Sequence, residues 1–318
     1  MAAAVAMLDE RHDDLSQNST DENTYELGSI KKHNVAIACL PSGVTGTNSA
    51  ATVAKSMLFT FPSIRFGLMV GIGGGAPSKN IDIRLGDVVV SKPDKTYGGV
   101  VQYDFGKTTG KDQFTRTGAL DKPPPVLLTA VSRLEAEHML KGNQLQKHLS
   151  EMQIENQDTK SKFRYQGAGH DQLFEPEYDH VKNSDTCENC DARKLVDRPM
   201  RTTPRIHYGL IASGNQVMRH GSTRERLRKE LGVLCFEMEA AGLMDNFPCL
   251  VIRGICDYAD SHKNKQWQGY AAAIAAAYAK ELLSIIPTSQ VENTRTVAEA
   301  ISEASKSALQ IFSASATS

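Results

Sequence analysis

Three acidic residues at the ends of apolar runs have the types and spacing best suited to chemistry in this sequence. Glu237 and Glu239 follow the apolar run 233–236, and Asp257 ends a second apolar run at 250–256. Such runs predict buried strands, and ligands of open α/β sheets bind at strand ends. A carboxylate there can hold sugar hydroxyls or protonate a leaving group. We therefore expect Glu239 and Asp257 to converge on one cavity and to act on a bond to ribose.

Each of these residues also has an ordinary structural interpretation. Glu239 could complement the dipole at the start of a helix, and Asp257 could cap a turn. Glu237 suits a supporting role better than a catalytic one. Arg253, which interrupts the second apolar run, is expected to pair with a buried acid.

A glycine cluster follows the strand expected at 66–72. Gly71, Gly73 and Ala76 match the dinucleotide-binding pattern G-x-G-x-x-G/A, but residues 77–80 replace the helix that this pattern requires. The glycines could simply permit a tight turn, or their N–H groups could approach a ligand. We favour the second interpretation, with Gly73 and Gly74 at the site.

Strands alternate with helices along most of the chain. Solid apolar strands indicate a sheet that is covered on both faces, which predicts an α/β fold with a single central sheet flanked by helices. The expected strands are 25–30, 33–40, 66–72 and 87–91, and the expected helices are 47–59, 126–148 and 271–286.

The sequence divides into a core and two terminal segments. Residues 25–287 form the expected core domain, and 151–204 is a polar insertion within it. Residues 1–24 predict a short helix followed by a solvated loop. The tail 288–318 predicts weak helix or disorder.

Composition restricts the class of protein. The 318 residues carry 36 basic and 37 acidic side chains without a basic stripe, so binding to nucleic acid lacks electrostatic support. No apolar stretch reaches the roughly 18 residues that cross a bilayer, and the N-terminus lacks a secretory pattern. We expect a cytoplasmic protein that contacts neither nucleic acid nor membrane, with reduced cysteines.

The polar insertion holds a candidate metal site. Cys187 and Cys190 form a C-x-x-C pair, and His180 precedes them, so the three side chains could bind zinc with His170 or a carboxylate as the fourth ligand. The pattern is incomplete because no second pair of ligands follows. Free surface thiols are the alternative interpretation of this pair.

Two small basic clusters lie near the expected site. They contain Arg219 and His220 in one segment and His262, Lys263 and Lys265 in another. They could form solvated loops, or they could contact phosphates of a nucleotide substrate.

Five short motifs, in a fixed order along the chain, are similar to those of a known protein family. They occupy 71–75, 85–90, 209–214, 237–241 and 253–257. In this combination the chain resembles the purine nucleoside phosphorylase and methylthioadenosine–adenosylhomocysteine nucleosidase superfamily over residues 25–286. It is most similar to the version at the N-terminus of fungal proteins that often continue into NTPase or repeat regions. The resemblance implies a three-layer fold with a mixed sheet, a homo-oligomer, and cleavage of a purine N-glycosidic bond without a required cofactor.

The resemblance also implies roles for individual residues. Asp257 would protonate the purine base, Glu239 would bind the ribose hydroxyls, and Met238 would pack on the sugar, with Glu237 beside them. Residues after the Ser-Gly turn would enclose the base. These are Asn215, Gln216, Val217 and Met218, and Val217 replaces an aromatic residue of the family, which predicts weaker stacking.

The sequence departs from the family in two places. The strand before the glycines lacks the phosphate-binding arginine, which favours water as nucleophile, although Arg65 or Arg84 could substitute. The family's first strand ends in a glutamate that positions water, whereas residues 1–10 look like the helix after that strand, and Glu10 does not match the glutamate. We therefore expect slow or absent hydrolysis of an adenine nucleoside or nucleotide. Phosphorolysis and a non-catalytic nucleoside-binding or interaction module are the alternatives.

Overall fold

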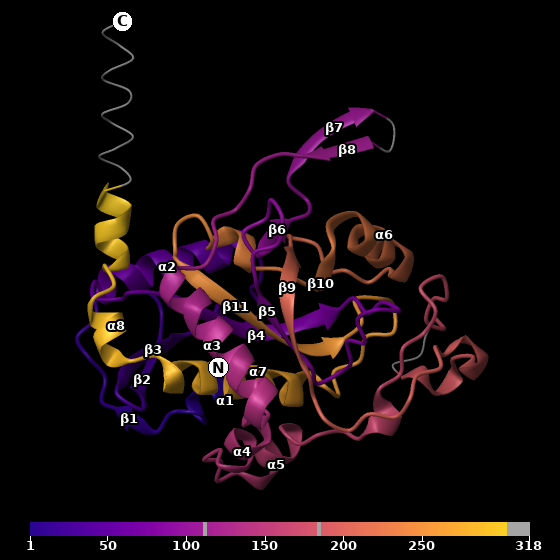
Figure 1. Cartoon of the computed structure of the whole chain (residues 1–318), viewed down its shortest axis with the longest axis horizontal. Coiled ribbons are helices and arrows are strands. Elements are labelled where there is room, and N and C mark those ends of the chain that lie inside the picture. The colour runs from indigo at the N-terminus through magenta and orange to yellow at the C-terminus, as the bar shows by residue number, and fades with distance from the viewer. Residues whose placement is uncertain (111–112, 183–185, 304–318) are drawn as a thin grey trace, which may run out of the picture.

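A six-stranded mixed sheet forms the centre of the computed structural model, which describes residues 1–110, 113–182 and 186–303 (Figure 1). Its order is β10-β4-β11-β5-β9-β6. The central strand β11 is parallel to β4 and antiparallel to β5, so the prediction of an α/β fold with a central mixed sheet is confirmed. The strands are β4 (Gly67–Gly75), β5 (Val88–Ser91), β6 (Val100–Gln102), β9 (Ile206–Ser213), β10 (Val233–Glu237) and β11 (Cys249–Asp257).

Strand β10 closes part of this sheet into a ring. It pairs antiparallel with the glycine end of β4, at Gly74 and Gly75, and parallel with β9. The carboxyl ends of β10 and β11 therefore both meet the glycine end of β4. This arrangement brings the three motifs that carry the candidate chemistry to one end of the sheet.

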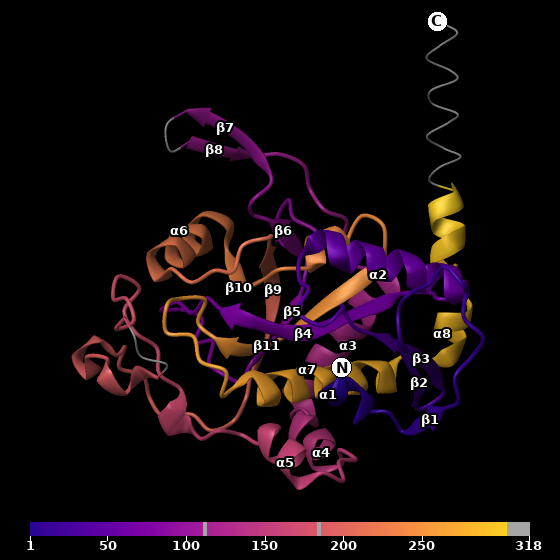
Figure 2. The ribbon, with the colours of Figure 1, turned by 180° about the vertical axis from the view of Figure 1, so that it is seen from behind.

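The central sheet lies between two of the longer helices. Helix α7 (Gln268–Ile285) packs against β11 and β4, and α2 (Thr47–Thr60) lies on the opposite side of these strands (Figures 1 and 2). The approach of α7 is close, because a Cβ atom at Gly254 would lie 1.8 Å from the carbonyl oxygen of Ala271. Glycine on the strand and alanine on the helix thus allow the two backbones to pack together. Helix α6 (Gly221–Leu231) covers β10.

The helix expected over 126–148 is divided in two. Helix α3 (Pro125–Lys141) ends before Gly142, and α4 (Leu145–Ser150) follows a short turn. Gly142 has a φ of 75°, a conformation that glycine adopts readily and that cannot continue a right-handed helix. Both helices pack against α7.

The N-terminal segment is more ordered than predicted. Helix α1 (Ala2–Val5) packs on α7, and β1 (Glu10–His12) joins β2 (Tyr25–Ile30) and β3 (His33–Ala38) in an antiparallel sheet. The prediction of a solvated loop was therefore wrong at β1, which pairs with β2 from Glu10 to His12. Backbone pairing needs no apolar side chains, so the exposed sequence of β1 gave no strand pattern.

Two further elements complete the periphery. The hairpin of β7 (Gly106–Gly110) and β8 (Gln113–Arg116) projects from the body and was not predicted (Figure 1). At the C-terminal end, α8 (Thr288–Glu292) and the helical residues 297–303 agree with the expected weak helix. Val297 is buried and donates a backbone hydrogen bond to Ile64 (2.8 Å). Residues 304–318 of the expected tail lie outside the described residues.

The polar insertion folds as short elements fastened to the core by arginines. It contains α5 (Gln157–Lys162) and the 3₁₀ helices η1 (Ala168–His170), η2 (Cys187–Asn189) and η3 (Ala192–Lys194). Arg201 donates to the buried carboxylate of Asp87 (2.6 Å), and Arg198 donates to the Tyr258 hydroxyl (2.9 Å). An ion pair to the residue before β5 and a hydrogen bond to the residue after β11 thus hold this segment, which is poor in aliphatic residues, against the core.

Candidate active site

Glu237 is the buried centre of the turn after β10. Its side chain is fully buried, and its carboxylate accepts hydrogen bonds from the guanidinium of Arg253 and from the backbone N–H groups of Glu239 (3.1 Å) and Ala240 (3.0 Å). The expectation that Arg253 pairs with a buried acid is met. The assignment of Glu237 to substrate binding is corrected, because its oxygens are occupied and sealed from solvent. Glu237 instead fixes the backbone that presents Glu239.

The chain after Glu239 forms only the short 3₁₀ helix η4 (Ala240–Gly242). A helix start at Glu239 was one interpretation of the sequence, and the helix that follows Glu239 is a single 3₁₀ turn. Gly242 instead packs onto α2, where an added Cβ atom would lie 2.0 Å from the carbonyl oxygen of Thr47. The small side chains therefore serve a close contact between backbones, which sequence alone does not distinguish from helix propensity.

Glu239 is the more accessible of the two glutamates. Its side chain is 15% exposed, and one carboxylate oxygen lies 3.4 Å from Nη2 of Arg253. Burial raises the pKa of Glu239 above the ordinary glutamate value, and the Arg253 guanidinium offsets this only in part. Met238, the residue before it, is half-buried.

The raised pKa of Glu239 predicts a pH effect on stability. Because ionisation is disfavoured in the folded chain, the stabilisation is complete below the unfolded-state pKa and is lost as pH rises through the folded-state pKa. Glu239→Gln has no carboxyl group to ionise. Its free energy of unfolding should therefore increase relative to that of the unmodified chain as pH rises above the ordinary pKa of glutamate. Denaturant midpoints at several pH values measure this. Exposed Glu22→Gln is the control, and a difference that stays constant with pH would contradict the prediction.

Asp257 ends β11 directly beside the glycines of β4. Its Oδ1 accepts hydrogen bonds from the Ala259 backbone N–H and from the Lys263 ammonium group, both at 2.8 Å. The side chain is 10% exposed. The turn interpretation of Asp257 is thus visible in the structure, and Ala259 takes a left-handed φ of 52° within that turn. Sequence spacing gave no sign that Lys263 would reach back to Asp257.

Gly74 is required by the position of Asp257. A Cβ atom at Gly74 would lie 2.6 Å from Oδ1 of Asp257 and 2.8 Å from Cβ of Ala259. We expect Gly74→Ala to displace the Asp257 turn and to destabilise the chain by about 1–3 kcal/mol. Denaturant unfolding measures the loss. Gly169→Ala is the matched control because no atom lies within 4 Å of its added Cβ, and equal stability of the two variants would contradict the prediction.

Glu239 and Asp257 line two different cavities of the described residues. Glu239 and Arg253 line a large cavity of about 880 Å³, whereas Asp257 lines a small one of about 20 Å³. In this conformation the two acids therefore face separate cavities, and their convergence on one ligand stays a prediction.

A β-bulge explains the separation. Ile255 pairs with Gly73 and Asp257 pairs with Gly74, so Cys256 is an extra residue in β11. Consecutive strand residues face opposite sides of a sheet. Consistent with this, the Cβ direction of Gly73 meets Arg253, and that of Gly74 meets Asp257. The bulge thus turns Asp257 away from the face that carries Arg253 and Glu239.

The expected base-binding residues follow β9 and differ in their roles. Asn215 accepts hydrogen bonds from the backbone N–H (3.0 Å) and hydroxyl (3.1 Å) of Thr47, and its own N–H donates to Asp104 (2.7 Å). Val217 is 54% exposed, and Met218 is half-buried against the neighbouring core. The amide side chain of Asn215 thus joins this loop to the start of α2. Neither Thr47 nor Asp104 was singled out from the sequence.

The large cavity borders an open strand edge. On the side away from β11, β4 pairs with β10 only at Gly74 and Gly75, and the described residues supply no strand beside 67–73. The cavity lies between this edge and β3, and α2 and α7 also line it. Glu10 is exposed on β1, so it does not replace a glutamate at the site.

Comparisons with known proteins identify the family of this chain. The family model of the phosphorylase superfamily matches residues 2–286. A nucleotide-binding leucine-rich repeat (NLR)-like protein of Hyaloscypha variabilis is 49% identical over 298 residues, which are 93% of this chain and 29% of that protein. A 5′-methylthioadenosine/S-adenosylhomocysteine nucleosidase of Mycobacterium bovis is 35% identical over 89 residues, 26% of this chain and 35% of that enzyme. This chain therefore spans less than two thirds of either relative.

Solved structures of such nucleosidases share the fold. A putative 5′-methylthioadenosine/S-adenosylhomocysteine nucleosidase of Borrelia burgdorferi, bound to adenine, has a TM-score of 0.57 and 17% identity, covering 90% of this chain and 97% of that one. The Helicobacter pylori nucleosidase has a TM-score of 0.54 and 16% identity, covering 89% and 92%. No single helix in the described part of this chain is long and apolar enough to cross a membrane. The consecutive helical segments Gln268–Ile285 and Thr288–Glu303 together have the length and composition of a membrane span, but they meet at an angle of 90°. The first of these segments is the buried helix α7. By the match to its family model, the chain belongs to the phosphorylase superfamily.

Proposed function

We propose that this chain cleaves the N-glycosidic bond of an adenine-type nucleoside or nucleotide by hydrolysis. The observation that supports the proposal is that β10, which ends two residues before Glu239, and β11, which ends at Asp257, both pair with the glycine end of β4. Membership of the superfamily supports cleavage of a purine nucleoside in general.

In this proposal the two carboxyl groups have different tasks. The C1′–N bond breaks, and the departing base takes a proton from Asp257 at a ring nitrogen. A water oxygen bonds to C1′, and the proton that this water loses passes to solvent, from which Asp257 regains its own. This proton is needed because an adenine anion is a poor leaving group, and such general acid catalysis contributes about 10²–10⁴ in rate. Glu239 holds the ribose hydroxyls as positive charge grows on the sugar, with Met238 against the ring.

Both groups must face one ligand for this reaction. Lys263 now holds Asp257, so the loop after β11 has to turn when substrate binds. The bulge at Cys256 is the place where such a rotation would begin. Contacts with the base would provide the differential binding that shifts this equilibrium. Lys263, once released, would be available to a phosphate group of a nucleotide.

Water is favoured over phosphate as the nucleophile because the two alternative arginines are engaged elsewhere. Arg84 is buried and donates to Asp82 (2.9 Å), and Arg65 donates to the carbonyl oxygen of Thr294. Neither guanidinium is free to clamp a phosphate ion at the glycine turn. Phosphorolysis would require one of them to leave its partner.

The separate cavities and the open edge of β4 favour a second candidate, a nucleoside-binding or interaction module with little turnover. In both candidates we propose a homo-oligomer in the cytoplasm. The bound ligand is the same adenine-type compound, so the two functions differ in product formation and not in recognition.

A product assay distinguishes these functions. Purified chain is incubated with adenosine, 5′-methylthioadenosine or ATP, with and without phosphate, and released adenine is quantified by chromatography. Adenine and free ribose without phosphate support hydrolysis, whereas ribose 1-phosphate formed only with phosphate indicates phosphorolysis. Saturable binding by calorimetry without product supports the module. Neither binding nor product for any of these compounds would contradict both candidates.

A further inference from the structure

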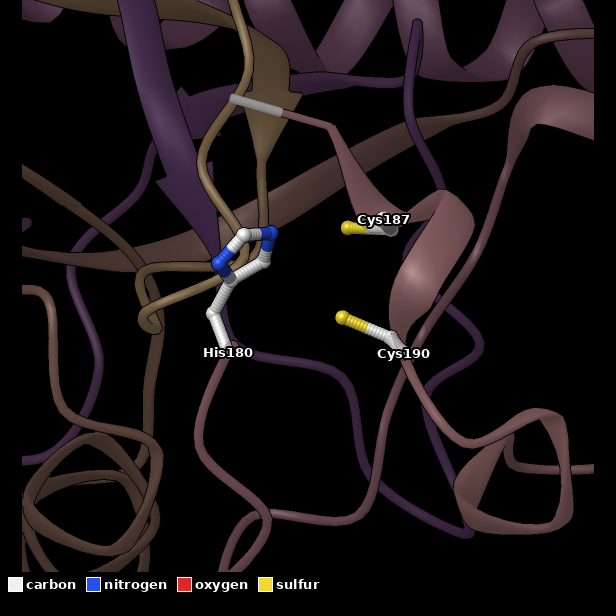
Figure 3. Close-up of side chains that lie close together, drawn as sticks. All are labelled: His180, Cys187 and Cys190. Atoms are coloured by element: carbon white, nitrogen blue, oxygen red, sulfur yellow. The ribbon is translucent and has the colours of Figure 1, made fainter. Parts of the chain in front are cut away.

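Three potential metal ligands of the polar insertion lie together. The ligand atoms of His180, Cys187 and Cys190 are all within 4.8 Å of one another, and all three residues are partly buried. Figure 3 shows both sulfur atoms directed toward the imidazole ring, with the two cysteines on one short helical turn and the histidine on the facing strand of chain. Two sulfurs and an imidazole are ligands that zinc prefers.

A fourth potential ligand comes from the loop after β11. The side chain of His262 is 3% exposed, and neither of its ring nitrogens has a hydrogen-bond partner. Its ring stacks on Phe174 at 4.1 Å and lies edge-on to His180, with 5.4 Å between the ring centroids. Its Nδ1 lies 3.7 Å from Oδ1 of Asp260, which is too long for a hydrogen bond, so this buried imidazole still gains from a bonding partner at one of its nitrogens. The small cavity lined by Cys187, Asp260 and His262 lies beside it.

Backbone hydrogen bonds already hold the cluster in position. The N–H of His180 donates to Ser261 Oγ (2.9 Å), and the N–H of Cys190 donates to the carbonyl oxygen of Cys187 (3.1 Å). His180 Nε2 also lies 3.1 Å from the carbonyl oxygen of Thr186, which restrains the ring. His180, Cys187 and Cys190 therefore need only small movements to meet at one ion.

We propose that His180, Cys187 and Cys190 bind one zinc ion, with His262 as the fourth ligand. Zn–S bonds of about 2.3 Å and Zn–N bonds of about 2.0–2.1 Å require the four atoms to draw closer than they now lie. On binding, the two thiols release their protons to solvent and both imidazoles bind as neutral ligands. No step of glycosidic-bond cleavage passes through this ion.

The ion would cross-link two segments that are far apart in the sequence. His262 lies in the same loop as Asp257 and Lys263, whereas the other three ligands belong to the polar insertion. Zinc would therefore hold the insertion against the loop that carries the proposed general acid. This is a positioning role, and the metal site stands whether or not the chain cleaves nucleosides.

Metal content and cobalt spectra test the proposal. Chain purified from zinc-supplemented cells should hold about one zinc ion, and the Co²⁺-substituted chain should show thiolate charge-transfer absorption with the intense d–d bands of a tetrahedral site. Cys187→Ser and Cys190→Ser should each lose about half of the thiolate absorption, because one cysteine ligand remains, and the double variant should lose all of it. Each single variant should weaken zinc binding by more than about 100-fold, because even removal of groups around the ligands costs 10–100-fold. Exposed Cys39→Ser is the matched control and should behave as the unmodified chain.

His262→Gln separates the fourth ligand from the other three. It should keep the thiolate absorption but bind zinc less tightly and alter the d–d bands. An unchanged affinity and spectrum would overturn the assignment of His262. Zinc content of the unmodified chain no higher than that of the Cys187→Ser/Cys190→Ser double variant would overturn the site.

A measurement on the unmodified chain covers the case in which a variant fails to fold. Removal of zinc with a chelator should increase proteolytic cleavage within 171–198, and added zinc should restore resistance. Cleavage that is the same before chelation, after chelation and after zinc addition would also overturn the proposal.

Discussion

Replacing Asp257 with asparagine should lower the rate of adenine release by about 10²–10⁴-fold, the usual contribution of a general acid. Asparagine has nearly the same shape and can still accept the hydrogen bond from Ala259, so the turn after β11 should persist. It cannot deliver a proton to the departing base. The assay is adenine release under saturating nucleoside, and unfolding curves establish that the variant remains folded.

The leaving group provides the sharper control for this prediction. A riboside with an activated aryl leaving group departs without protonation, so Asp257→Asn should slow its cleavage far less than that of adenosine. Asp14→Asn, an exposed carboxylate far from the strand ends in sequence, should change neither rate. Equal losses on both substrates would show that Asp257 supports the structure and is not the acid.

The second large effect concerns the buried pair between Arg253 and Glu237. Their side chains are 5% and 0% exposed, and they are hydrogen-bonded to each other. Arg253→Ala should destabilise the chain by about 3–5 kcal/mol, because it leaves the Glu237 carboxylate without its charged partner in a buried site. Denaturant unfolding measures the loss of free energy.

A double variant identifies the cause of this loss. Arg253→Met combined with Glu237→Gln removes both charges and keeps an acceptor for the N–H groups of Glu239 and Ala240. It should recover most of the stability. Arg226→Ala breaks a pair that is 65% and 43% exposed, and should cost less than about 1 kcal/mol. Similar losses for Arg226→Ala and Arg253→Ala would contradict the explanation from burial.

The parts of the fold that sequence predicted depend on patterns local to one segment. The solid apolar runs before Glu237 and Asp257 became β10 and β11, and the periodic residues of 47–59 became α2. Positions with close backbone contacts, such as Gly74 and Gly254, required glycine for reasons that emerge only when neighbouring strands and helices are in place. At these positions the sequence shows a glycine, but it does not show which neighbouring atoms leave no room for a larger side chain.

The candidate site was less predictable because tertiary contacts determine its geometry. The order of the motifs predicted Glu239 and Asp257 at the same end of the sheet. The bulge at Cys256 nevertheless turns the Asp257 side chain to the face opposite Arg253 and Glu239. Lys263 reaches Asp257 through a turn whose shape no local pattern indicates. Sequence predicted a supporting role for Glu237, but its contacts with Arg253 and the backbone of the turn could be identified only from the structure.

The strand order has a consequence for how the chain folds. The central strand β11 lies between β4 and β5 but is the last strand of this sheet in the sequence. During synthesis, β4 and β5 are made more than a hundred residues before β11. The backbone N–H and C=O groups on the edges that face β11 therefore stay unpaired until β11 has been made. Pairings so distant in sequence are slow to form, and the unpaired edges are prone to aggregate meanwhile. Yield of native protein should therefore depend strongly on temperature and chaperones during expression.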